Sequence, residues 1–266
     1  MMTPLFKKLF IMAVPVMLCA GLSAKGHCDG KCDRPTPYEY SSNYFAYPYL
    51  EAEPPALTPA PEGYKPFHVE HYGRHGSRYL INASQYDRPI GQLEIAARNG
   101  RLTPLGERTL EHFRTMRDKA RLRDGELSDI GAEQHKAITT RMARNFPEVF
   151  MTDAYIDGRS TIVIRCILSM LNGLDGLRTL NPRLHFKTDA SYADMVYMNY
   201  DDSIASRHMK KAQKTALKEF AKRHPVGSGY LTRLFTDSAF VADSINVKTL
   251  QSGLFAVLTN DQSHHG

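Results

Sequence analysis

Hydrophobic and polar residues alternate along residues 67–72, which is the pattern of a strand with two different faces. Phe67, Val69 and His71 would point to one side, and the residues between them to the other. A run rich in arginine, histidine and glycine follows at once, at residues 73–78. Ligands bind at the carboxyl ends of strands in open α/β sheets. The pattern therefore predicts a strand that places residues 73–78 at a binding edge.

Two later segments begin with residues typical of helix starts. Thr103 before Pro104 offers a capping hydroxyl followed by proline at the first helical position, and Ser128 offers the same kind of cap. Amphipathic sequence follows each of them. Helices are therefore predicted near residues 105–120 and 130–145.

The rest of the chain alternates between short strand patterns and longer helical ones. The predicted elements are strands over 153–156 and 184–187, and helices over 161–172, 204–223 and 244–259. Strands that alternate with helices favour the α/β class with a mainly parallel sheet. The Lys-rich segment 204–223 is expected to belong to a helical cap over that sheet, around residues 190–240.

The first 24 residues have the features of a secretory signal peptide. Lys7 and Lys8 form a short basic region, and an apolar run follows over residues 9–22. That run is short for a membrane span, so no transmembrane segment is expected in the mature chain. Cys19 allows a lipid anchor as an alternative, which the large leucine before it disfavours. We expect a secreted or periplasmic protein.

Residues 25–66 are expected to form an N-terminal arm, because most of this stretch is rich in proline and tyrosine and lacks a helical period. Cys28 and Cys32 are close enough in sequence to pair in an oxidising compartment. Cys166 has no evident partner in the sequence. The remaining residues, 67–266, would then form the folded domain.

Composition narrows the candidate partners. Hydrophobic residues make up 42% of the 266 residues, which is enough for a sizeable core. The net charge is +6, from 34 basic and 28 acidic residues, and it becomes +4 once the signal peptide with its two lysines is removed. This excess suits an anionic small molecule as well as an ordinary basic surface. The chain has no long Lys/Arg run and no nucleic-acid motif, so nucleic acid is not an expected partner.

The segment 74–78, Arg-His-Gly-Ser-Arg, carries the most specific chemistry. Arg74 and Arg78 offer planar, permanently charged groups that suit phosphate oxygens. His75 between them is a credible nucleophile toward phosphorus when its ring is neutral, which requires a group that holds its other nitrogen. The neighbouring glycines let the backbone approach an anion closely. These residues predict a site for phosphoryl transfer.

Metal binding is the alternative for the histidines nearby. His68, Glu70 and His71 are residue types found in metal sites. On a strand, however, His71 would point away from the other two, and the spacing matches no zinc-binding helix. His264 and His265 could also bind a metal, but a frayed tail is the preferred interpretation. No metal and no cofactor are expected.

The segment 74–78 resembles the Arg-His-Gly-x-Arg motif of the histidine phosphatase superfamily, in its acid phosphatase and phytase branch. Residues 61–67 and 160–166 most resemble the bacterial multiple inositol-polyphosphate phosphatases. The resemblance extends over roughly residues 35–260. It implies a phosphoglycerate-mutase-like α/β fold, in which a mainly parallel sheet has flanking helices and a helical cap. It also identifies the Leu-Ser-x-x-Gly segment at 127–131 as architectural.

The same resemblance implies the roles of the site residues. His75 would attack phosphorus and carry a transient phosphohistidine that water hydrolyses. Arg74, Arg78 and Arg165 would bind the phosphate oxygens, with Arg165 in the first turn of a helix whose positive end also faces the anion. The implied protein is a secreted phosphomonoesterase that acts on inositol polyphosphates such as phytate. A general acid phosphatase is the alternative in the same class.

The family's second catalytic motif, a late His-Asp or His-Ala-Glu, is not found after Arg165. Its carboxylate would protonate the leaving alkoxide, and loss of a general acid typically slows a reaction by about 10²–10⁴-fold. We therefore expect a partial phosphatase domain, the N-terminal portion of a longer enzyme with an incomplete sheet. A catalytically impaired anion-binding chain is the alternative from a different class.

Five lysines are candidates for a broad basic mouth around a multiply phosphorylated ring. They are Lys187, Lys210, Lys211, Lys214 and Lys218. A solvated helix face is the other interpretation of the same residues. Neither the pattern nor the resemblance indicates which ring phosphate would leave first.

Overall fold

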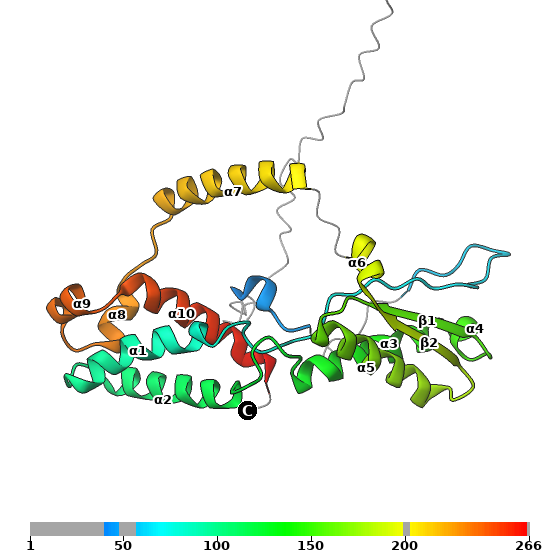
Figure 1. Ribbon diagram of the computed structural model, residues 1–266, viewed down its shortest axis with the longest axis horizontal. Coiled ribbons are helices and arrows are strands. Elements are labelled where there is room, and N and C mark those ends of the chain that lie inside the picture. The colour runs from blue at the N-terminus through cyan, green and yellow to red at the C-terminus, as the bar shows by residue number, and fades with distance from the viewer. Residues whose placement is uncertain (1–39, 48–56, 199–202, 265–266) are drawn as a thin grey trace, which may run out of the picture. The chain divides into compact units, whose positions relative to one another are not determined.

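The computed structural model describes residues 40–47, 57–198 and 203–264 (Figure 1). The expected signal peptide, Cys28 and Cys32 lie outside the described residues, and two stretches of the expected arm lie within them. All the elements below belong to one compact unit.

One group of helices encloses the larger hydrophobic core (Figure 1). α1 (Ser84–Arg98) packs against both α2 (Pro104–Lys119) and α10 (Val247–Asn260). α8 (Gly229–Leu234) packs on α2, and α9 (Ser238–Ser244) packs on α8. The largest side chains buried among these helices are Leu80, Tyr86, Leu93, Phe113, Met116 and Leu250. Removing this apolar surface from water is the main force that holds the helices together.

Local capping explains two of the helix starts. Thr103 Oγ1 accepts a hydrogen bond from the Gly106 amide at 3.1 Å, and a proline follows in the first turn of α2. Ser128 Oγ accepts one from the Gly131 amide at 3.2 Å at the start of α3 (Asp129–Asn145). Each cap satisfies an amide that a helix end otherwise leaves without a partner. Both predicted helices are confirmed to within one residue at each end.

The second group of elements contains the sheet. β1 (Tyr155–Ser160) pairs in parallel with β2 (His185–Ala190). α5 (Ile164–Leu180) connects the two strands and packs on both β1 and α3 (Figure 1). Neighbouring parallel strands need such a crossover, which is usually a helix. The smaller hydrophobic cluster lies here and includes Phe150 of α4 (Pro147–Phe150), Leu177 and Leu184.

The predicted strands over 153–156 and 184–187 are present as β1 and β2, each shifted toward its carboxyl end. The helix predicted over 161–172 is present as α5. In the part of the chain that the structure describes, the fold is mixed helical with a small two-stranded parallel sheet. This architecture is consistent with the α/β class, although the sheet is narrower than the pattern predicts.

The strand predicted over 67–72 is wrong. Phe67 is 93% exposed, Val69 is only partly buried, and none of these residues joins a sheet ladder. Alternation favours an extended backbone, but a strand also needs the backbone groups of a neighbour. Within the described ranges β1 and β2 pair only with each other. Residues 73–78 therefore follow an unpaired segment, and a single antiparallel bridge joins Arg78 to Leu127.

Two helices follow the sheet, in the range expected for a cap. α7 (Ser203–Arg223) confirms the helix predicted over 204–223 and has no buried residue. α6 (Tyr192–Met198) precedes it. The helix predicted over 244–259 is present as α10, which begins three residues later. No helix in the described ranges is long and apolar enough to span a bilayer.

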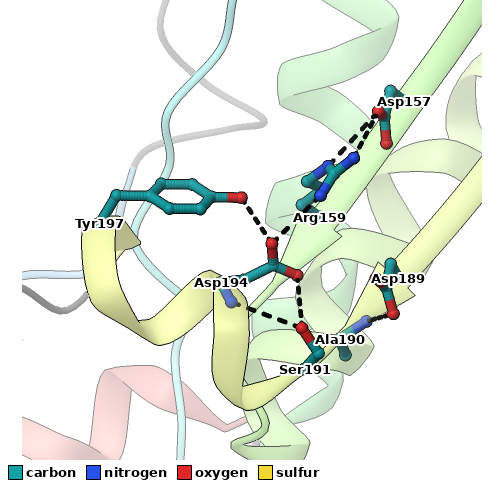
Figure 2. A network of polar contacts seen from close by, with 7 residues as sticks. All are labelled: Asp157, Arg159, Asp189, Ala190, Ser191, Asp194 and Tyr197. Atoms are coloured by element: carbon teal, nitrogen blue, oxygen red, sulfur yellow. Dashed lines mark hydrogen bonds and ion pairs between the residues drawn. The ribbon is translucent and has the colours of Figure 1, made fainter.

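A buried carboxylate fastens α6 to β1, as Figure 2 shows. Asp194, whose side chain is only 3% exposed, accepts hydrogen bonds from Tyr197 Oη at 2.6 Å and from Arg159 Nη1 at 3.2 Å. Arg159 also forms an ion pair with Asp157 on the same strand. The Tyr197 hydroxyl and the Arg159 charge hold the pKa of Asp194 below its usual range. The carboxylate is thus paired and hydrogen-bonded, as a buried charge must be.

Candidate functional site

The segment 73–78 lines a pocket of about 290 Å³. Three of the four predicted site residues, Arg74, His75 and Arg78, lie in its wall. Residues from other parts of the chain complete that wall: Asn43, Tyr44, Phe45 and Tyr47 from the arm, Gln134, His135 and Ile138 from α3, and His71, Asn260 and Ser263. The volume is at the lower end of the usual range for small-molecule pockets.

His75 is held in one tautomer by the neighbouring backbone. Its Nδ1 lies 2.8 Å from the Gly76 carbonyl oxygen. Because a carbonyl oxygen can only accept a hydrogen bond, Nδ1 must carry the hydrogen and donate it. The lone pair of the neutral ring is then on Nε2, which is the atom available to attack an electrophile. The sequence alone does not identify the group that holds the second ring nitrogen of His75. In the structure this group is the Gly76 carbonyl.

The surroundings of His75 favour its neutral form. Partial burial lowers the pKa of the ring most, and the positive charges of Arg165, Arg74 and Arg78 lower it further. The hydrogen bond to Gly76 acts in the opposite direction. Imidazolium loses hydration on burial and is repelled by guanidinium groups, so both lowering causes act against the charged ring. The neutral form of the ring thus persists to lower pH than in a free histidine.

The two arginines of the segment are oriented by main-chain oxygens. Arg78 Nη1 donates to the Tyr79 carbonyl at 2.8 Å, and Arg74 Nη1 donates to the Asn43 carbonyl at 3.3 Å. Arg78 is half-buried, whereas Arg74 is exposed. Each guanidinium has five N–H groups, so donors remain for the oxygens of an anion. The pair can therefore bind an anion in the pocket beside His75.

Arg165 lies in the first turn of α5, but it is not part of the pocket wall. Its Nη1 donates to the Gly125 carbonyl at 3.4 Å, and its Nε is buried without a hydrogen-bond partner. Its charge nevertheless reaches the site, because it lowers the pKa values of both His75 and Arg78. A buried donor without a partner is unfavourable.

Two helices supply side chains that hold the backbone around His75. The Gly76 amide donates to Ser169 Oγ of α5 at 3.1 Å. The next amide, that of Ser77, donates to Gln134 Oε1 of α3 at 2.9 Å. Buried amides need acceptors, and in a paired strand the neighbouring strand supplies them. Here the two side chains supply them instead. The segment is thereby fixed without being part of a sheet.

The carbonyl groups of the segment are held in the same way. The Ser77 carbonyl accepts hydrogen bonds from both the amide and the hydroxyl of Ser128. The Arg78 carbonyl accepts one from Asn260 Nδ2 at 2.8 Å. Asn260 is almost fully buried at the end of α10, where its Oδ1 also accepts a hydrogen bond from Tyr86. Three separate helices therefore contribute to the position of His75.

Two glycines allow α3 to approach the segment closely. A Cβ on Gly76 would overlap the carbonyl oxygen of Gly131, and a Cβ on Gly131 would overlap the carbonyl oxygen of Ser77. Any larger residue would force the two backbones apart. This contact gives the segment 127–131 the architectural role expected for it.

Sequence reasoning missed the polar residues of α3 that line the pocket. His135 is buried in the pocket wall, and burial lowers the pKa of its ring. The available signal was the spacing of Gly131, His135 and Thr139, which share the buried face of α3. Polar residues on a face that a helix buries indicate a hydrogen-bonded network.

The histidines and the glutamate weighed as metal ligands have different surroundings. His68 and Glu70 are exposed, and no three His, Cys, Asp or Glu side chains in the described ranges could hold a metal ion together. The interpretation of His264 as frayed is wrong. Its ring lies 4.3 Å from that of Tyr79, and burial lowers its pKa to about 4. His265 lies outside the described residues.

The five candidate lysines of a basic mouth do not line the pocket. Lys187 lies on β2, and the other four lie on α7. Lys210, Lys214 and Lys218 are spaced by four residues, so they share one face of that helix. The four candidate lysines on α7 are exposed.

No protein-family model matches the chain, and no curated protein matches it. Among solved structures, the multiple inositol polyphosphate phosphatase of Bifidobacterium longum in complex with inositol hexasulfate matches with a TM-score of 0.51 and 15% identity, over 79% of this chain and 58% of that one. The apo form of that phosphatase matches with a TM-score of 0.43 and 24% identity, over 48% and 26%. The chain thus spans at most 58% of the length of these structures. Its mixed helical architecture with a small parallel sheet is similar to the fold of that phosphatase.

Proposed function

We propose that this chain is a phosphoric monoester hydrolase of the histidine phosphatase superfamily, in its acid phosphatase and phytase branch. The observation that carries the proposal is the His75 ring, hydrogen-bonded through Nδ1 to Gly76, with Arg74 and Arg78 in the same pocket wall. A neutral imidazole with a free nitrogen beside two guanidinium groups is suited to attack on a phosphate ester. The fold similarity to an inositol polyphosphate phosphatase is consistent with this proposal.

In the proposed reaction, His75 Nε2 attacks the phosphorus of a bound monoester. The P–N bond forms while the bond from phosphorus to the ester oxygen breaks, and the leaving alkoxide takes up a proton from solvent water. Arg74 and Arg78 hold the other phosphate oxygens, and Arg165 adds positive charge nearby. Water then attacks the phosphohistidine, which releases inorganic phosphate and the neutral ring. Phosphoryl transfer depends mainly on positioning and charge stabilisation, and these residues supply both.

We propose inositol polyphosphates, phytate included, as the substrate class. The resemblance of residues 61–67 and 160–166 to multiple inositol-polyphosphate phosphatases supports this choice. A ring with several phosphates needs cations beyond one clamp, and we propose the exposed lysines of α7 for this role although they lie outside the pocket wall. A general acid phosphatase is the alternative within this class. We further propose a secreted or periplasmic location, which rests on the signal-like residues 1–24.

A second candidate function is anion binding with impaired turnover. No carboxylate lines the pocket among the residues that the structure describes. Without a general acid, the leaving alkoxide departs more slowly, by about 10²–10⁴-fold. The arginines would still bind phosphate in such a chain. The two candidates therefore differ in phosphate release and agree in phosphate binding.

The experiment that tests the proposal is phosphate release from inositol hexakisphosphate by the purified chain, beside His75→Ala and His68→Ala. His68 is exposed and outside the pocket wall, so it is the matched control. We expect release that is lost in His75→Ala and retained in His68→Ala. Equal release by the parent and His75→Ala would overturn the proposed nucleophile. Negligible release by all three chains, with phosphate still bound, would favour the anion-binding candidate.

A further inference from the structure

Two neighbouring residues of the arm contact both arginines of the pocket. The Asn43 carbonyl accepts a hydrogen bond from Arg74 Nη1 at 3.3 Å, and the guanidinium carbon of Arg78 lies 6.0 Å from the centre of the Tyr44 ring. Tyr44 also acts on the charge of Arg78, because it opposes the lowering of the Arg78 pKa by burial. Resting on the proposed function, we propose that Asn43 and Tyr44 are positioning residues that hold both guanidinium groups ready for phosphate.

This part of the arm is fixed to the C-terminal elements. The Ala46 amide donates to Gln262 Oε1 at 2.8 Å. The Tyr44 ring packs edge-on against Phe255 of α10, with 6.4 Å between the ring centres. Asn43 and Tyr44 belong to a short 3-10 helix, Ser42–Tyr44, that places them side by side. Residues far apart in the sequence therefore define where the arm meets the two arginines.

Gln134 of α3 joins the arm to the nucleophile segment. Its Oε1 accepts from the Ser77 amide at 2.9 Å, and its Nε2 donates to the Tyr47 carbonyl at 3.3 Å. Arg141 of the same helix donates to Tyr47 Oη at 2.6 Å. The arm and the segment thus share an anchor, and a displaced arm would release contacts to both arginines.

The physical consequence concerns phosphate affinity. A free arginine side chain loses rotamer freedom when it binds an anion, and a side chain that is already held loses less. A guanidinium beside an aromatic ring gains a further cation–π interaction. Loss of these contacts should weaken phosphate binding and raise KM, with a smaller effect on kcat, because His75 has its own backbone contact.

The test uses the full chain with Tyr44→Leu, Tyr44→Phe and Tyr40→Leu. Tyr40 is 68% exposed in the same arm, and it is the matched control. The dissociation constant for inorganic phosphate is measured by calorimetry, KM and kcat by phosphate release, and folding by thermal melting. We expect phosphate affinity to fall by about tenfold in Tyr44→Leu. We expect a fall of about threefold in Tyr44→Phe, which keeps the ring and loses the hydroxyl, and no change in Tyr40→Leu.

Phosphate affinity in Tyr44→Leu and Tyr44→Phe equal to that of the parent would overturn the proposal. A loss of kcat with KM unchanged in both variants would also overturn it, because that result would indicate a general packing role. Should Tyr44→Leu fail to fold, the Tyr44→Phe result decides alone. A parent that binds phosphate but releases none from an ester would refute the proposed hydrolase, while the affinity series would still decide the role of the arm.

Discussion

The reactivity proposed for His75 depends on which of its ring nitrogens carries the hydrogen. The contact from Nδ1 to the Gly76 carbonyl leaves the lone pair on Nε2. Partial burial and three guanidinium groups then favour the neutral ring. The arginines proposed to bind phosphate therefore have a second effect, since their charges also favour the neutral form of His75.

We expect the pKa of His75 to lie below 6.5, the value of a free histidine, and to rise in Arg165→Gln. Loss of a positive charge makes imidazolium less unfavourable, so the shift is upward. NMR titration of the ring carbons measures both values without substrate. Arg183→Gln, which removes an exposed arginine paired with Asp153, should leave the His75 pKa unchanged. A parent value at or above 6.5 would contradict the environment described for His75.

The residue types of the site could be predicted from the sequence, but the side chains that hold their segment in place could not. Arg74, His75 and Arg78 lie within five positions, so a local motif identifies them. Gln134 and Ser169 hold the same segment, and they lie 57 and 93 residues away in the sequence from the amides that they bind. A hydrogen bond over such a separation leaves no pattern in the neighbouring sequence.

Among the elements, α3 contributes most to the site, and it does so through a close backbone approach. Its N-terminal turn meets the segment at Gly76 and Gly131. The next residues of the same helix, Gln134 and His135, reach the segment and the pocket. α3 thus sets how closely the two backbones approach, holds the backbone of the segment and forms part of the pocket wall.

We expect Gly131→Ala to destabilise the fold by about 1–3 kcal/mol, because the added methyl group overlaps the Ser77 carbonyl oxygen. Gly91→Ala is the matched control, since Gly91 also lies within a helix and has open space around it. That change should be neutral or stabilise by up to about 1 kcal/mol. Chemical denaturation measures both values. Equal stabilities of the two variants would show that α3 can move away from the segment without loss.

Helices with local start signals could be predicted, and elements without them could not. α2 and α3 begin at capping residues within their own first turns. α1 begins without a capping side chain and contains Pro89, so the sequence offers no start signal for it. The unpaired segment 67–72 has the alternation of a strand, but pairing depends on distant backbone groups.

Across the whole molecule, the site depends on contacts between segments that are far apart in the sequence. Asn260 at the end of α10 contacts the Arg78 carbonyl, 182 residues earlier. It also accepts a hydrogen bond from Tyr86, whose hydroxyl accepts one from the Leu80 amide. The larger core and the pocket are therefore joined through one buried amide.

We expect Asn260→Ala to lower the free energy of unfolding by about 1–3 kcal/mol, because it leaves the Arg78 carbonyl and the Tyr86 hydroxyl without this partner. Ser252→Ala on the exposed face of the same helix should change it by no more than about 0.5 kcal/mol. Thermal and denaturant unfolding provide the comparison. An Asn260→Ala chain as stable as the Ser252→Ala chain would contradict the coupling between α10 and the segment.

The arm is the part of the organisation that sequence reasoning described least well. Its proline and tyrosine content indicates an irregular segment, and its described residues include the 3-10 helix Ser42–Tyr44. The composition does not indicate that Asn43, Tyr44 and Tyr47 form part of the pocket wall. That placement depends on α3 and α10, which lie much later in the chain.

The most direct test of the central claim is a search for phosphate on His75 during turnover. The parent and His75→Ala would be mixed with inositol hexakisphosphate, quenched at alkaline pH to preserve a P–N bond, and digested for peptide mass spectrometry. We predict a phosphoryl group on the peptide that contains His75, and none in the variant. Continued phosphate release with His75 unmodified, or with the phosphoryl group on another residue, would contradict the account.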